Sequence, residues 1–301
     1  MNIKIFLLKK QCFKFLIIKL LIVLSYLGMN DLKGQTFNQT ELKLKDFFDS
    51  LSVEKNDTFK LMYCDSIENV LNTVLVSNES FTFPFDQLKY LGKITADDNL
   101  LRVYIWNITF NDGTFKYFGF IQYKLKVKKE YKMLTFKLND KSLEIKRPET
   151  FVGNHEDWFG VLYYQIVVKT FGKKTYYTML GWDGADDLIN TKIIEILTFN
   201  AIGEPTFGAS IFELGNESPK RILFHFGNQQ KMSLLYEKNN DRIVYDHLSP
   251  SKPEYEGMYQ YYGADFSYDA LHFEKGKWKY RPAIDARNSK TKFDLYKRNK
   301  N

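Results

Sequence analysis

The stretch Leu101-Arg-Val-Tyr-Ile-Trp-Asn-Ile-Thr-Phe110 decides the fold class, together with the residues that continue it to Lys126. These are the turn Asn111-Asp-Gly113 and the run Phe115-Lys-Tyr-Phe-Gly-Phe-Ile-Gln-Tyr-Lys-Leu-Lys126. Both long runs are rich in aromatic and β-branched residues and have a period of two, which is typical of strands. Gly113 tolerates the positive φ that tight hairpin turns require. The stretch therefore predicts two antiparallel strands joined by a short turn.

The same pattern continues toward the C-terminus. Short polar turns separate the runs, so consecutive strands are expected to pair antiparallel. We predict a mainly β protein: an antiparallel meander forming a barrel, a sandwich or a highly curved sheet. The further strands are expected at about 133–138, 158–170, 175–182, 192–199, 221–226, 231–237, 242–247, 266–274 and 277–281.

Residues 36–80 have a different, helical period. Thr40 is expected to cap a first short helix and Asp57 a second one, with apolar residues at three- and four-residue spacing. Cys64 lies beside the apolar stripe of the second helix, where a buried, inert thiol is expected. The predicted organisation is a signal peptide (1–35), a helical segment (36–80), an antiparallel β domain (81–290) and a basic tail (291–301).

The N-terminus has the pattern of a secretory signal. A lysine-rich, acid-free stretch precedes the apolar run Leu20–Met29, and small Gly34 marks a cleavage point near Gln35. The run is well short of the roughly 20 apolar residues that a membrane-spanning helix needs. We therefore expect export to the periplasm, the outer surface or the medium, with no stable membrane span after cleavage. A retained anchor is the alternative.

Export changes what the charge of the chain means. The whole sequence has 43 basic and 36 acidic residues, but residues 1–35 hold six lysines and one aspartate. The remainder has 37 basic and 35 acidic residues, a net charge of +2, which argues against a nucleic-acid partner. Only Cys64 is left, so no intramolecular disulfide is possible, as suits a larger bacterial exported domain.

One short pattern occurs twice. Phe110-Asn-Asp-Gly113-Thr-Phe115-Lys-Tyr117 parallels Phe273-Glu-Lys-Gly276-Lys-Trp278-Lys-Tyr280. The two copies are either equivalent hairpins of a repeated architecture or hairpins with similar turn chemistry. No fixed period of 20–50 residues joins them, which favours the second interpretation.

The loop Gly181-Trp-Asp-Gly-Ala-Asp-Asp187 is the most unusual segment. Asp183, Asp186 and Asp187 place three carboxylates within five residues, and such oxygen ligands suit Ca²⁺. The spacing is not that of an EF-hand loop. The alternative is a polar hairpin or a helix cap, and no other cofactor is expected.

Acid–base chemistry has one candidate pair, Asp246 and His247. Motifs for nucleophiles, phosphate loops, dinucleotide binding and HExxH zinc sites are absent from the sequence. We therefore expect no enzyme activity. The rival hypothesis is a hydrolase that uses Asp183, Asp246 and His247 as an acid–base group.

The segment Glu254–Asp269 has the densest mixture of tyrosines and carboxylates. Such a mixture suits a carbohydrate, on which rings stack, or a protein partner, since tyrosine is enriched at interfaces. The alternative is that these tyrosines only pack a strand and its return loop. The candidate ligand-binding residues are Trp182, Asp183, Tyr255, Tyr259, Tyr262, Asp265 and Tyr268.

Three stretches carry a resemblance. They are Tyr176-Tyr-Thr-Met-Leu-Gly-Trp-Asp-Gly184, Asp246-His-Leu-Ser-Pro250 and Tyr261-Tyr-Gly-Ala-Asp-Phe-Ser-Tyr-Asp269. With the signal and the Lys/Asn/Phe-rich composition, the chain resembles a group of uncharacterised exported proteins of Bacteroidetes-type bacteria. That resemblance implies neither an activity nor site residues.

The leading functional hypothesis is a non-catalytic exported protein that binds a ligand or partner through the Trp182 and Tyr255–Tyr268 loops. A structural component of an envelope assembly is a third hypothesis, besides the hydrolase.

Overall fold

A computed structural model describes residues 36–284, which form two compact units. One unit comprises residues 36–54 and 58–89, and the other comprises residues 55–57 and 90–284. The predicted signal and the basic tail lie outside the described residues.

The first unit is a pair of helices with a short connection. Residues 36–53 are helical, and α2 (Asp57–Val74) begins after a break of three residues. The buried faces carry apolar residues at helical spacing, including Leu44 and Phe48 in the first helix and Ile67 and Leu71 in α2. Cys64 is buried on α2. No helix within residues 36–284 is both long enough and apolar enough to span a membrane.

The first helix includes residues that the sequence pattern placed before it. Thr40 lies inside the helix and does not cap it, because its hydroxyl donates to the carbonyl oxygen of Thr36 over 2.9 Å. A threonine can satisfy its hydroxyl in this way on the preceding turn, so its capping preference did not mark the boundary.

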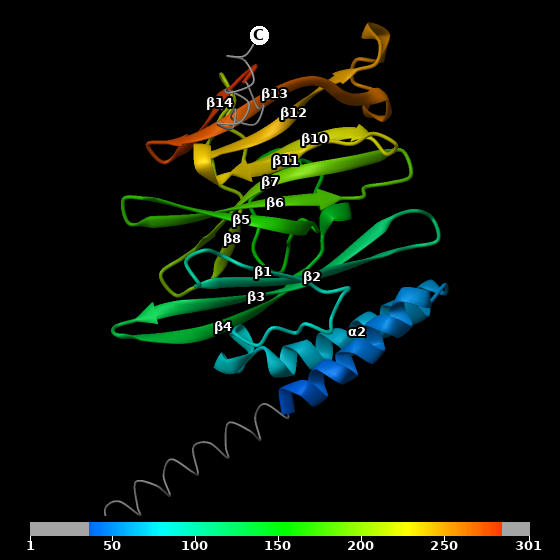
Figure 1. Cartoon of the computed structure of the whole chain (residues 1–301), viewed down its shortest axis with the longest axis vertical. Coiled ribbons are helices and arrows are strands. Elements are labelled where there is room, and N and C mark those ends of the chain that lie inside the picture. The colour runs from blue at the N-terminus through cyan, green and yellow to red at the C-terminus, as the bar shows by residue number, and fades with distance from the viewer. Residues whose placement is uncertain (1–35, 285–301) are drawn as a thin grey trace, which may run out of the picture. The chain divides into compact units, whose positions relative to one another are not determined.

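The second unit, which we call the β unit, is built from β-strands in three sheets (Figure 1). The first sheet has the order β1-β2-β3-β4: β1 (Gly92–Thr95), β2 (Leu101–Thr109), β3 (Phe115–Val127) and β4 (Glu130–Asn139). The central sheet has the order β10-β7-β6-β5, with β8 paired to β7: β5 (Leu162–Phe171), β6 (Lys174–Asp183), β7 (Ile189–Phe199), β8 (Pro205–Phe207) and β10 (Arg221–Gly227). The third sheet has the order β11-β12-β13-β14-β9: β9 (Phe212–Glu213), β11 (Leu234–Glu237), β12 (Arg242–Pro250), β13 (Tyr262–Glu274) and β14 (Lys277–Arg281).

The predicted fold class is confirmed. Consecutive strands within each sheet pair antiparallel, as in the register Leu101↔Tyr123 to Thr109↔Phe115 between β2 and β3. Two pairings depart from a simple meander: β10 pairs with β7, and the short β9 runs parallel to β14. The result is a stack of open sheets with helices at the N-terminal side of the sequence.

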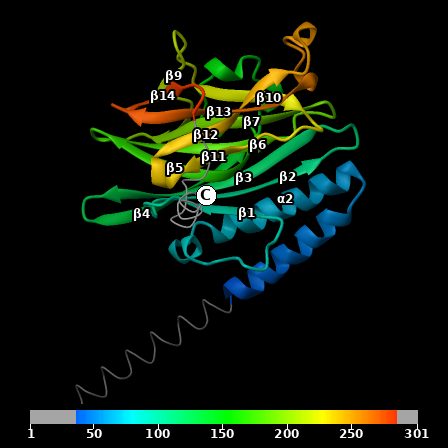
Figure 2. The ribbon, with the colours of Figure 1, turned by 45° about the horizontal axis from the view of Figure 1, so that its top comes forward.

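The central sheet has a hydrophobic core on each face, and Figure 2 shows the three layers from a second direction. On one face Tyr177, Met179 and Ile193 pack with residues of β2 and β3. On the other face Leu180 and Ile194 pack with residues of β12, β13 and β14. Side chains alternate between the two faces of a strand, so both faces of β6 and β7 are apolar.

A buried ion pair joins β10 to β7 in the central sheet. Arg221 on β10 donates to Glu195 on β7, and both side chains are fully buried. The Glu195 carboxylate also accepts the Tyr163 hydroxyl, and Tyr163 accepts the indole N–H of Trp158 over 2.9 Å. Burial and the Glu195 charge raise the pKa of Tyr163 well above its usual value. Since every member is enclosed, this network serves the fold and leaves nothing for a ligand.

Candidate functional site at the loop end of the β unit

Four connections meet at one end of the β unit, on the right-hand side of Figure 1. We call the segments 111–114, 183–189, 227–233 and 251–261 the loop end. A Cβ on Gly113 would lie 2.4 Å from a carboxylate oxygen of Asp187, so these two connections touch. Asn228 donates through its backbone N–H to Leu188 over 2.9 Å, and a Cβ on Gly227 would lie 2.5 Å from the Gln260 carbonyl oxygen. Segments more than 100 residues apart in sequence thus form one surface.

Tyrosines form the most prominent part of this surface. Tyr255 and Tyr261 stack with ring centroids 4.2 Å apart, and Tyr259 lies against Tyr262 at 5.2 Å. Two 3₁₀ turns, Pro253–Tyr255 and Tyr259–Tyr261, carry three of these rings, and Tyr262 is the first residue of β13. Tyr259, Tyr261 and their neighbour Met258 are exposed. Exposed tyrosine and methionine are the side chains that protein interfaces favour.

A histidine of β10 supports the tyrosine cluster from beneath. The His225 ring lies 5.0 Å from the Tyr259 ring, and its Nδ1 lies 2.8 Å from the Thr191 hydroxyl. Burial lowers the pKa of His225. A neutral imidazole therefore packs against Tyr259 at neutral pH.

The loop end has an acidic balance. Its four segments contain six acidic residues (Asp112, Asp183, Asp186, Asp187, Glu254 and Glu256) and two basic ones (Lys231 and Lys252). Lys252 lies 4.0 Å from Glu254 and 5.7 Å from the centre of the Tyr255 ring. The excess of carboxylates favours a partner with positive charge.

Two of the three aspartates of the Gly181–Asp187 loop accept hydrogen bonds within the fold. Asp183 accepts the Tyr117 hydroxyl over 2.7 Å and the backbone N–H of Ala185 over 3.0 Å. Asp186 accepts the backbone N–H groups of Leu188 and Ile189. Within residues 36–284, no group of three or more His, Cys, Asp or Glu side chains is arranged to hold a metal ion.

Burial also changes the acidity of Asp183. Removal from water raises the pKa of this carboxyl, although the bonds from Ala185 and Tyr117 act in the opposite direction. The side chain faces β3 and closes the end of β6, so its first role is to join the first and central sheets.

Trp182 lies beneath the surface of the loop end. Its indole N–H donates to Asn190 over 3.1 Å, and its ring meets Phe115 edge-on at 5.6 Å. The side chain is half-buried. It supports the Asp183–Ile189 loop, while the exposed apolar residue of that loop is Leu188.

The sequence suggested Asp246 and His247 as an acid–base pair, but in the structure the carboxylate beside His247 is that of Asp269. His247 Nδ1 lies 2.8 Å from a carboxylate oxygen of Asp269 on the neighbouring strand. Asp246 accepts the backbone N–H of Ser233 over 2.7 Å. Asp183 bonds to residues of β3 and its own loop, so the contacts of Asp183, Asp246 and His247 have no residue in common.

The His247–Asp269 pair is well oriented. The Asp269 carboxylate also accepts the Tyr280 hydroxyl over 3.1 Å and the Ala283 backbone N–H over 3.0 Å. Its side chain is only 6% exposed, whereas that of His247 is 45% exposed. The hydrogen bond to Asp269 raises the pKa of His247.

A bulge lies opposite His247. The register passes from Asp246↔Tyr268 to Leu248↔Ala264, so residues 265–267 face a single residue of β12. Asp265 accepts both the hydroxyl and the backbone N–H of Ser267, and these bonds lower its pKa. Phe266 has a φ of 69° and is 93% exposed. Tyr268 is half-buried at the end of the bulge.

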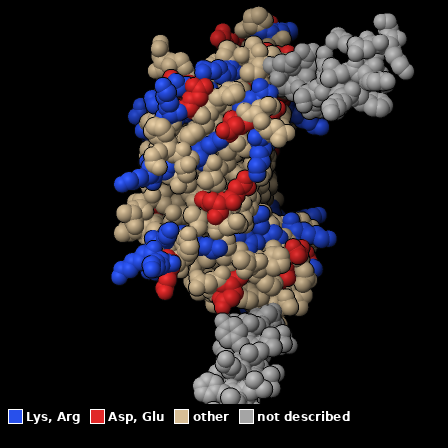
Figure 3. All heavy atoms as spheres, turned by 60° about the vertical axis from the view of Figure 1, so that its left-hand side comes forward, with Lys and Arg blue, Asp and Glu red and all other residues tan. Residues whose placement is uncertain are grey.

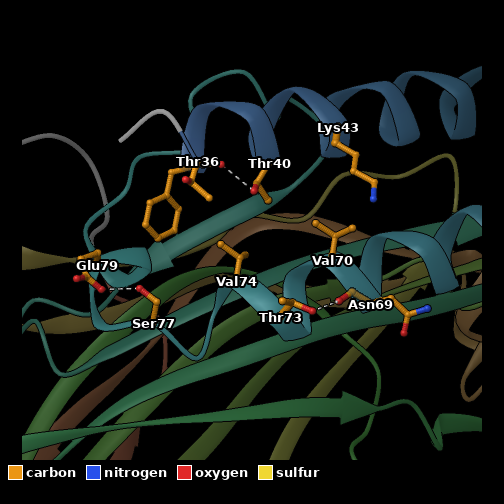
Figure 4. A pocket seen from close by; sticks show the side chains of 10 residues that line it. Thr36, Thr40, Lys43, Asn69, Val70, Thr73, Val74, Ser77 and Glu79 are labelled. Carbon is orange, nitrogen blue, oxygen red and sulfur yellow. Dashed lines mark hydrogen bonds between the residues drawn. The ribbon is translucent and has the colours of Figure 1, made fainter. Parts of the chain in front are cut away.

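The helical unit has a pocket of its own, shown in Figure 4, with a volume of about 600 Å³. Phe37, Val70 and Val74 give it apolar walls, and Lys43 lies at its rim. The hydroxyl of Thr73 donates to a carbonyl oxygen of its own helix. The volume suits a small molecule, but the sequence offered no motif there.

The sequence-predicted residues thus have different surroundings. Tyr255, Tyr259 and Tyr262 meet in one cluster, whereas Asp265 and Tyr268 belong to the bulge of β13. Sequence reasoning missed Leu188, Met258 and Tyr261 as surface residues and Asp269 as the partner of His247. Met258, Tyr261 and Asp269 lie within the tyrosine-rich segment Glu254–Asp269. Asp269 comes to lie beside His247 only through the pairing of β12 with β13.

Comparisons with protein families, curated proteins and solved structures find no match to this chain. The class that the fold and site define is a stacked-sheet β protein with an acidic, tyrosine-bearing loop surface.

Proposed function

We propose that this chain is an exported, non-catalytic binding protein whose loop end captures a protein partner with a basic surface. The observation that carries the proposal is the group of exposed Met258, Tyr259 and Tyr261 within an acidic surround. Interfaces commonly combine a tyrosine-rich centre with a polar rim. The carboxylates would favour approach of a positively charged partner.

A protein partner fits this surface better than a small ligand. The tyrosine rings stack on one another and project from two 3₁₀ turns. Projecting aromatic rings can pack against the surface of another protein, where tyrosines often contribute much of the binding energy. The predicted signal in residues 1–35 supports an extracytoplasmic location for the encounter.

The test compares two double variants as baits for proteins extracted from the cell envelope. Tyr259→Ala/Tyr261→Ala removes the exposed rings of the loop end, and Val127→Ala/Tyr131→Ala removes two exposed apolar side chains elsewhere. One defined protein should be retained by the wild type and by the second variant and be captured at least about tenfold less by the first. Its purified form should show the same preference and bind more weakly at high salt. Equal capture by both variants would contradict the proposal.

A second candidate function is hydrolysis, and the His247–Asp269 pair favours it. A buried carboxylate that orients an accessible imidazole is the arrangement used in general acid–base catalysis. A panel of chromogenic esters and glycosides tests it. Activity that His247→Gln abolishes would support a hydrolase, and absence of turnover across the panel would count against it.

A further inference from the structure

The end of the β unit opposite the loop end is formed by hairpin tips. We call the segments 127–132, 171–174, 200–204 and 275–276 the hairpin end. A Cβ on Gly276 would lie 2.6 Å from the Phe171 ring, and one on Gly203 would lie 2.3 Å from the Leu134 side chain. The tips from all three sheets therefore lie beside their neighbours, on the left-hand side of Figure 1.

Large apolar side chains are exposed at these tips. Val127 and Tyr131 flank the β3–β4 turn, Phe171 precedes the β5–β6 turn and Ile202 lies in the β7–β8 turn. Their exposed fractions range from 48% to 67%. Three separate hairpins at one end of the β unit therefore expose large apolar side chains, which is unusual for tips that face only water.

Lysines surround these apolar side chains. The four segments contain six lysines (Lys128, Lys129, Lys132, Lys173, Lys174 and Lys275) and two glutamates (Glu130 and Glu204), an excess of four positive charges. None of the six lysines forms an ion pair with another described residue. Figure 3, in which this end faces the reader, shows groups of lysine and arginine side chains with carboxylates scattered among them.

Three carboxylates outside these four segments are bound to other groups. Asp241 pairs with Lys169, and Asp97 lies 3.2 Å from Lys238. Asp98 accepts the Tyr177 hydroxyl over 2.8 Å. The charge of the six lysines is therefore available to a partner.

A hollow between two tips is suited to a head group. It has a volume of about 610 Å³, and Lys173, Lys174 and Asn200 line it together with several threonines. Its floor includes Tyr123 and Phe199, whose rings stack with centroids 3.7 Å apart. Two ammonium groups beside hydroxyl and amide groups can bind a phosphate.

We infer that the hairpin end docks on an anionic lipid surface. Val127, Tyr131, Phe171 and Ile202 enter the interfacial region of the bilayer, and the lysines contact lipid phosphates around them. Long lysine side chains can bury their methylene groups while their ammonium groups reach the head groups. The charge excess supplies the attraction to anionic lipid. The acidic loop end then points away from the membrane, toward soluble partners.

Vesicle co-flotation tests the charge contribution, with the chain in the form isolated from cells. Binding should be stronger to vesicles of one part phosphatidylglycerol and two parts phosphatidylcholine than to phosphatidylcholine alone, and it should weaken as salt increases. Lys128→Gln/Lys129→Gln should weaken it on the order of 30-fold, from about 1 kcal/mol per lysine near such a surface. The matched control Lys231→Gln/Lys252→Gln removes the same charge from the loop end and should leave binding unchanged.

Tryptophan fluorescence tests insertion of the tips. Trp106, Trp158 and Trp278 are buried and Trp182 is half-buried. Since all four also fluoresce, the surroundings of the indole introduced by Tyr131→Trp are obtained by subtracting the emission of the wild-type chain. The emission of the introduced indole should move to shorter wavelength when anionic vesicles are added, and Tyr259→Trp at the loop end should not respond.

Three results would overturn the inference. They are equal binding to both kinds of vesicle, equal weakening by the two lysine variants, and tighter binding to a soluble polyanion such as heparin than to vesicles. Each is independent of whether the loop end captures a protein, so the two proposals can fail separately.

Discussion

Asp183 illustrates how the fold uses a carboxylate that could also have served a metal ion. Its oxygen accepts one hydroxyl from β3 and one amide from its own loop. Both donors lose their partner if the side chain is removed. The residue therefore has a structural task that can be measured separately from any binding task.

Two substitutions at this position separate its hydrogen bonds from its charge. Asp183→Asn retains an acceptor for Tyr117 and Ala185 and should change the free energy of unfolding by less than about 1 kcal/mol. Asp183→Ala leaves both donors unsatisfied and should cost about 1–3 kcal/mol. Urea denaturation measures both. An equal loss of stability in Asp183→Asn and Asp183→Ala would contradict this account, because it would show that the charge matters more than the hydrogen bonds.

The fold also controls the ionisation of His247. Its raised pKa means that the folded state binds the proton more tightly than the unfolded state does. The stability from this pair is therefore fully present below the unfolded pKa of about 6.5 and is lost as pH rises through the higher folded pKa.

The partner of His247 can be tested directly. Asp269→Asn should lower the pKa of His247, because a neutral amide stabilises the imidazolium less than a carboxylate does. It should also remove the dependence of unfolding free energy on pH in that window. Asp246→Asn is the matched control and should leave the titration of His247 almost unchanged. Histidine NMR titration measures all three chains, and an unchanged titration in Asp269→Asn would contradict the assignment.

At the scale of elements, the two similar hairpins have different turns. In the first, Gly113 alone of the turn residues has a positive φ, of 86°, and its N–H bonds back to Phe110. In the second, Lys275 and Gly276 both have positive φ, of 50° and 82°. The turns also lie at opposite ends of the β unit. Similar sequences therefore adopt two different turn conformations, which argues against a repeated structural unit.

Two turn glycines give a matched pair of substitutions. Gly172 has a φ of 61° with open space around it, so Gly172→Ala should cost about 1 kcal/mol from backbone conformation alone. Gly113→Ala has a similar backbone cost and must also displace the Asp187 carboxylate, so it should cost about 2 kcal/mol or more. Thermal unfolding compares them. Equal losses would show that the contact between segments 111–114 and 183–189 is not maintained in solution.

The strands could be predicted from the sequence because their local pattern and their tertiary burial agree. Leu101–Thr109 and Thr175–Trp182 are rich in aromatic and β-branched residues, and both runs form strands that are buried along most of their length. The features that could not be predicted depend on pairing across the chain. Nothing near Arg221 indicates that it pairs with Glu195, and nothing near His247 indicates Asp269. The tyrosine cluster was visible as composition, but which rings are exposed depends on two 3₁₀ turns.

At the scale of the whole β unit, the two ends have opposite character. The loop end carries tyrosines and an excess of four negative charges, and the hairpin end carries separate apolar tips and an excess of four positive charges. The strands of the three sheets run between these ends. The cores on both faces of the central sheet pack the three sheets together. One end can therefore bind a membrane surface while the other binds a partner.

Site-specific photo-crosslinking in cells tests the central claim, which is that the loop end binds a basic protein. A photoreactive phenylalanine analogue replaces Tyr259 in one chain and Tyr131 at the hairpin end in another; both native side chains are exposed. We predict a defined protein adduct from position 259 alone, reduced when Glu254→Lys/Glu256→Lys is added, because those carboxylates face the basic partner. No adduct from position 259, or the same adduct from both positions, would contradict the account.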